Sequence, residues 1–93
     1  MRIIGFIEHP SLKISVFKND GRTSVKFETA LYEQTFKLGD DERFASLENI
    51  QQLVDNQMLE KVNQVFQQMH ANRLEAISRA YPISAVHLLE EII

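Results

Sequence analysis

The 93-residue sequence contains no cysteine and no tryptophan, and it has only three glycines and two prolines. Without cysteine the chain can form no disulfide scaffold, no thiolate nucleophile and no cysteine-ligated zinc or iron–sulfur site. The three glycines are far apart in the sequence, so no glycine-rich loop can bind a phosphate through its backbone. The chain also has no Walker, GxSxG or HExxH motif. We therefore expect no enzymatic activity, no cofactor and no metal site.

No apolar run reaches the roughly 20 residues that a membrane-spanning helix needs. The first ten residues contain one basic residue and an apolar run that ends at Glu8, which is not typical of a signal peptide. We therefore expect a cytoplasmic protein with no membrane attachment.

The formal net charge is −3, which does not favour a general nucleic-acid binder. Residues 1–40 hold six basic and five acidic side chains, whereas residues 41–93 hold four and eight. A chain of this length can bury roughly 65% of its unfolded surface, which is enough for one modest core. We expect a single domain over residues 1–93, β-rich over 1–38 and helical over 44–93.

Alternating apolar and polar residues predict a β-hairpin in the first half of the chain. One predicted face carries Leu12, Ile14, Val16, Thr23, Val25 and Phe27. With residues 18–21 as a four-residue loop, Phe17 would pair with Arg22, and Ile14 with Val25. This register sets Lys13 directly opposite Lys26, a like-charge conflict that a bound anion would relieve. A third strand is predicted over Tyr32–Leu38 and a further one over Met1–Glu8.

The second half of the chain predicts helices. Ser46 is a suitable N-cap for a short helix that ends near Asp55. An apolar stripe of helical period then runs from Met58 to about Tyr81, where Pro82 ends the helix. Residues 84–93 form another amphipathic segment. The predicted fold class is α+β: an antiparallel meander of three to four strands (residues 1–38) packed against a long C-terminal helix with short flanking helices.

Apolar residues at both ends of the chain exceed what one small core can accept, which predicts an interaction surface. Our first hypothesis is therefore a small protein-interaction domain, either a homodimer or a binder of another protein. The predicted interface residues are Ile3, Ile4, Phe6, Ile7, Leu88, Leu89, Ile92 and Ile93.

The other face of the predicted sheet is mainly basic and carries one exposed aromatic ring, the general form of a single-strand nucleic-acid platform. The alternative hypothesis is a single-stranded nucleic-acid or anion binder. Its candidate residues are Lys13, Phe17, Arg22, Lys26 and Lys37.

The remaining polar residues give weaker predictions. The three histidines share no metal-ligand spacing, and the acidic run 40–42 lacks the pattern of a calcium loop. If the chain were an enzyme, His70, with Arg73 nearby, is the position at which we would expect a site.

Overall fold

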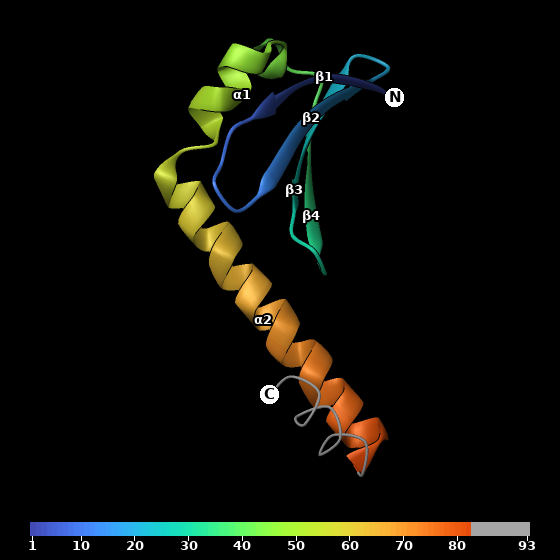
Figure 1. The fold of residues 1–93 in the computed structure, drawn as a ribbon. Helices are drawn as coiled ribbons and strands as arrows, with labels where there is room; N and C mark the ends of the chain where they lie inside the picture. The colour runs from blue at the N-terminus through green and yellow to red at the C-terminus, as the bar shows by residue number, and fades with distance from the viewer. Residues whose placement is uncertain (83–93) are drawn as a thin grey trace. The chain divides into compact units, whose positions relative to one another are not determined.

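A computed structural model describes residues 1–82 of the chain (Figure 1). Its elements, in order, are β1 (Arg2–Ile7), β2 (Lys13–Asn19), β3 (Arg22–Glu28), β4 (Glu33–Gly39), the 3-10 turn η1 (Glu42–Phe44), α1 (Leu47–Leu53) and α2 (Asn56–Ala80). The predicted α+β class, a meander of strands followed by a long helix, is confirmed. The chain divides into two compact units between Val62 and Asn63. A single domain over residues 1–93 stays a prediction.

The four strands form one sheet in the order β1-β2-β3-β4, each antiparallel to the next (Figure 1). Successive side chains of a strand point to opposite faces, and the predicted apolar face is the buried one. We call it the core face. The buried apolar residues of this first unit are Leu12, Ile14, Val16, Val25, Phe27, Ile50, Val54 and Val62.

The predicted register of the β2–β3 hairpin is wrong by two residues. Asn19 pairs with Arg22, so the loop has two residues rather than four, and Ile14 lies opposite Phe27. The cause is the dipeptide Asp20-Gly21, whose φ angles of 53° and 77° are those of a type I′ turn. This turn matches the right-handed twist of the flanking strands. The shift of two residues leaves every side chain on its predicted face.

Strand β1 contains a bulge between Ile3 and Gly5, with Ile4 as the extra residue. Gly5 lies opposite Val16 on the core face. A Cβ atom at Gly5 would come within 3.0 Å of Leu47 Cδ1, so the absence of a side chain lets α1 pack closely against β1. Ser46 caps α1 as predicted, because its Oγ accepts a hydrogen bond of 3.1 Å from Asn49 N.

Two side-chain hydrogen bonds tie the helical segments of this unit to the sheet. Thr23 is buried, and its hydroxyl donates to the carbonyl oxygen of Phe44 in η1 at 2.7 Å. Gln34 on β4 donates from Nε2 to the carbonyl oxygen of Val62, in the first turns of α2, at 2.9 Å.

The predicted long helix is present as α2, which spans 25 residues. Asp55 begins it, since its carboxylate accepts a hydrogen bond of 2.8 Å from Met58 N. No helix among residues 1–82 is long and apolar enough to cross a membrane. The predicted amphipathic segment 84–93 lies outside the described residues.

Candidate functional site

The face of the sheet opposite the core, which we call the open face, carries side chains in rows that run across the strands. Residues directly opposite in neighbouring strands point to the same face, with Cβ atoms roughly 5 Å apart. The row nearest the β2–β3 turn is Asn19 and Arg22. The next row is Ile3, Phe17, Ser24 and Lys37. The third is Phe6, Ser15, Lys26 and Thr35, and the fourth is Lys13, Glu28 and Glu33.

A hollow of about 630 Å³ lies at the end of the open face next to the β2–β3 turn. We call it the basic hollow. Four of the five predicted anion-binding residues line it: Phe17, Arg22, Lys26 and Lys37. Asn19, Ser24 and Thr35 add an amide and two hydroxyl groups, and Asp40 adds one carboxylate. The structure therefore brings together most of this candidate site, and it adds polar partners that sequence reasoning did not select.

Lys26 is engaged by its neighbours on the open face. Its ammonium nitrogen lies 5.2 Å from the centre of the Phe17 ring and 3.3 Å from Glu28 Oε1. The predicted like-charge pair of Lys13 and Lys26 is wrong, because Lys13 lies opposite Glu28. No anion is therefore needed to relieve repulsion between these two lysines.

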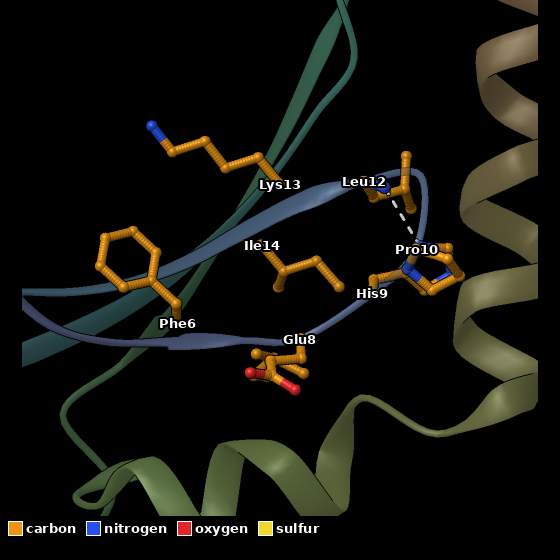
Figure 2. A pocket seen from close by; sticks show the side chains of 8 residues that line it. Phe6, Glu8, His9, Pro10, Leu12, Lys13 and Ile14 are labelled. Carbon is orange, nitrogen blue, oxygen red and sulfur yellow. Dashed lines mark hydrogen bonds between the residues drawn. The ribbon is translucent and has the colours of Figure 1, made fainter.

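Lys13 does not line the basic hollow, although its row lies next to that of Lys26. It lines a second hollow of about 590 Å³ beside the β1–β2 connection, together with Phe6 and Glu8 (Figure 2). The connection is held by the His9 ring, whose Nδ1 accepts backbone hydrogen bonds of 3.1 Å from both Ser11 and Leu12. The His9 ring therefore has a structural role in this connection.

The predicted interface residues of β1 fall into two groups. Ile3 and Phe6 are 52% and 53% exposed and lie in rows of the open face. Ile4 and Ile7 are half-buried, and Ile7 lies opposite the core residue Ile14. The other predicted interface residues, Leu88, Leu89, Ile92 and Ile93, lie outside the described residues.

The acidic run after β4 forms a local ion pair. Arg43 donates from Nε and Nη2 to the two carboxylate oxygens of Asp41, each at 3.0 Å, and its backbone nitrogen donates to Oδ1 at 2.8 Å. These hydrogen bonds from Arg43 lower the pKa of Asp41 from 3.8 to about 2. Within residues 1–82 no group of three or more His, Asp or Glu side chains could hold a metal ion.

The signal that sequence reasoning missed was the Asp20-Gly21 turn. A two-residue loop puts Asn19 beside Arg22 and separates Lys13 from Lys26 by one row. His70, the position considered for a catalytic site, is exposed on α2.

Comparison with models of protein families, with curated proteins and with solved structures finds no match for the chain.

Proposed function

We propose that the chain is a small, non-enzymatic protein-interaction domain that forms a homodimer through strand β1. The observation that carries this proposal is the exposure of Ile3 and Phe6, each about half exposed at one edge of the sheet. Large apolar side chains on an edge strand are typical of an interaction surface, because the strand also presents unpaired backbone groups.

The chemistry of the two sheet edges supports β1 as the binding edge. On the open face the other edge strand, β4, carries Glu33, Thr35 and Lys37, and charged side chains discourage pairing between sheets. Two rows cross the whole sheet: one runs from Lys37 on β4 to Ile3 on β1, and the other runs from Thr35 on β4 to Phe6 on β1. Each row is therefore polar at the β4 edge and apolar at the β1 edge.

A second copy is a suitable partner because β1 is complementary to itself in antiparallel orientation. A two-fold contact presents the same residues from both sides. Pairing centred between Ile4 and Gly5 would set Ile3 opposite Phe6 of the second copy, twice over, and would bring the Arg2 end of one strand near Glu8 of the other. The bulge at Ile4 shortens regular backbone pairing, so side chains would supply most of the contact.

Light scattering across a range of protein concentrations tests the proposal. We expect the full chain to approach twice its mass of 10.8 kDa as concentration rises. Phe6→Asp should weaken the dimer by roughly tenfold or more, because it buries a charge in an apolar contact. Leu89→Asp tests the part of the predicted interface that lies outside the described residues.

Thr35→Asp is the matched control, since Thr35 is the exposed residue at the opposite end of the row that contains Phe6. It adds the same charge to the same face and should leave the dimer unchanged. A monomer at every concentration, or equal weakening by Thr35→Asp, would overturn the assignment to β1.

Binding of single-stranded nucleic acid or another anion is the second candidate function. The observation in its favour is the clustering of Phe17, Arg22, Lys26 and Lys37 around the basic hollow. Affinity for a single-stranded oligonucleotide should then fall steeply with salt, with a slope set by the number of phosphates contacted. No binding at low salt would dismiss nucleic acid as the ligand.

A further inference from the structure

We propose that the basic hollow binds a small organic phosphate, with its phosphate group held by Arg22 and Lys37. This inference deepens the second candidate function and is independent of the dimer. It names a single phosphate monoester, rather than an extended strand, as the ligand.

The two cations that would hold the phosphate come from adjacent rows of the open face. Arg22 follows the two-residue turn directly, and Lys37 lies opposite Ser24 one row further on. Neither side chain forms an ion pair with any of residues 1–82. A guanidinium can hold two phosphate oxygens at once, and an ammonium adds a compact positive charge.

Rigid backbone elements position both cations. The turn before Arg22 is the compact Asp20-Gly21 type, which fixes the end of the hairpin. On β4, Lys37 lies directly before an irregularity of the β3–β4 pairing. Lys37 pairs with Ser24, but the next pair along is Gly39 with Thr23. Gly39 has a φ of 102°. Bulges commonly redirect side chains next to binding sites.

The charge of the open face favours a ligand with a single phosphate group. Rows on one face are about 7 Å apart, because alternate residues of a strand share a face. The third row offers only Lys26, already paired with Glu28. The fourth row contains one cation, Lys13, and two carboxylates, Glu28 and Glu33, so its formal charge is negative. A nucleic-acid strand that continued down the face would therefore meet carboxylates.

The remaining lining indicates what the organic part of the ligand carries. Phe17 and Met1 provide apolar surface, and Asp40 provides a hydrogen-bond acceptor. A ligand with hydroxyl or amino groups, such as a nucleoside monophosphate, could donate a hydrogen bond to Asp40 and pack its organic part against Phe17 and Met1. Inorganic phosphate has no organic part to make the apolar contact. A volume of about 630 Å³ is within the range of small-molecule sites.

Titration of the ¹⁵N-labelled full chain with adenosine 5′-monophosphate, followed by amide chemical shifts, tests the proposal. We expect saturable shifts at Arg22, Ser24 and Lys37, weaker binding of inorganic phosphate, and no binding of adenosine. Arg22→Gln and Lys37→Gln should each raise the Kd by roughly tenfold, because each removes a charge-assisted hydrogen bond. Lys13→Gln removes the same charge from the far end of the same face and should change the Kd by less than about twofold.

A ten-residue oligothymidylate without a terminal phosphate provides the second arm. The oligothymidylate could bind more tightly than the monophosphate, with Lys13→Gln weakening its binding as much as Arg22→Gln does. In that case the ligand is an extended strand. The phosphate-monoester proposal is then wrong, while the second candidate function stands. If neither probe gives saturable shifts, both are wrong. Repeating the titration with Phe6→Asp should give the same Kd, which separates this site from the dimer contact.

Discussion

Asp41 and Arg43 illustrate how much two neighbouring side chains change each other at an exposed position. The folded chain holds the pKa of Asp41 at about 2, below the ordinary value of 3.8, mainly through the hydrogen bonds from Arg43. The stabilising effect of this pair is therefore complete above about pH 4 and is lost as the pH falls through about 2.

We predict that Arg43→Gln returns the pKa of Asp41 toward 3.8. The side-chain carboxyl carbon of Asp41, followed by NMR between pH 1.5 and 6, gives the measurement. Glu42→Gln is the control, because Glu42 makes none of these hydrogen bonds, and the Asp41 titration should then change little. An unchanged midpoint in Arg43→Gln would show that Arg43 does not set it.

Lys13 and Lys26 show what the sequence could and could not predict for single residues. Alternation assigned both lysines to the open face correctly, because the period of two is insensitive to a two-residue shift. Their partners depend on register, and the apolar pattern fits Ile14 equally well against Val25 or Phe27. The shared face of Phe17 and Lys26 could therefore be predicted. Their proximity and the pairing of Lys13 with Glu28 could not, because both depend on the register.

At the scale of elements, the turn between β2 and β3 decides the register that the strands alone leave open. Asp20 and Gly21 both have positive φ, which glycine adopts freely and aspartate tolerates better than most residues. The conformational preferences of two turn residues thus choose between two registers that the alternation of the strands allows equally.

We predict that Gly21→Ala lowers the free energy of unfolding by about 1 kcal/mol, because alanine at φ 77° is strained. Asp20→Asn is the matched control, since asparagine suits positive φ at least as well, and it should change stability by less than about 0.5 kcal/mol. Urea unfolding of both variants gives the comparison. Gly21→Ala as stable as the original chain would contradict this account of the turn.

The bulge in β1 is the element-level feature that the sequence did not predict. The sequence predicted a strand over Met1–Glu8 and assigned Ile3, Ile4, Phe6 and Ile7 to an interface. The structure adds that α1 covers the core face at Gly5, while Ile3 and Phe6 stay half exposed on the open face. The extra residue of a bulge is recognised in a sequence by a break in the alternation of apolar and polar residues. In this strand nearly every residue is apolar, so there is no alternation to break.

At the scale of the whole molecule, burial is distributed unevenly between the two units. The sheet unit contains most of the buried residues, whereas Phe66 is the one buried residue among positions 63–82. Helix stability in proteins comes mainly from packing of an apolar face. The order of strands and helices could be predicted from the sequence, because the periodicity of apolar residues is a local property. The division into two units could not be predicted, because it depends on how the elements pack.

We predict that backbone amides at positions 70–80 exchange with solvent at least about 100-fold faster than those of Ile14 and Val25, since few buried contacts oppose local opening of this part of α2. Hydrogen exchange of the full chain, followed by NMR, gives the rates. Asn56–Val62, the start of the same helix, serves as the internal comparison and should exchange more slowly. Equal protection along α2 and the sheet would contradict the prediction.

The meander topology has a consequence for how the protein is made. Each strand pairs only with its neighbour in sequence, so every pairing step closes a short loop. When Gly39 leaves the ribosomal exit tunnel, all four strands are free to pair, while the residues of α1 and α2 are still inside the tunnel or not yet translated. The sheet can thus pair during synthesis, and its core face is exposed until Ile50, Val54 and Val62 emerge to cover it.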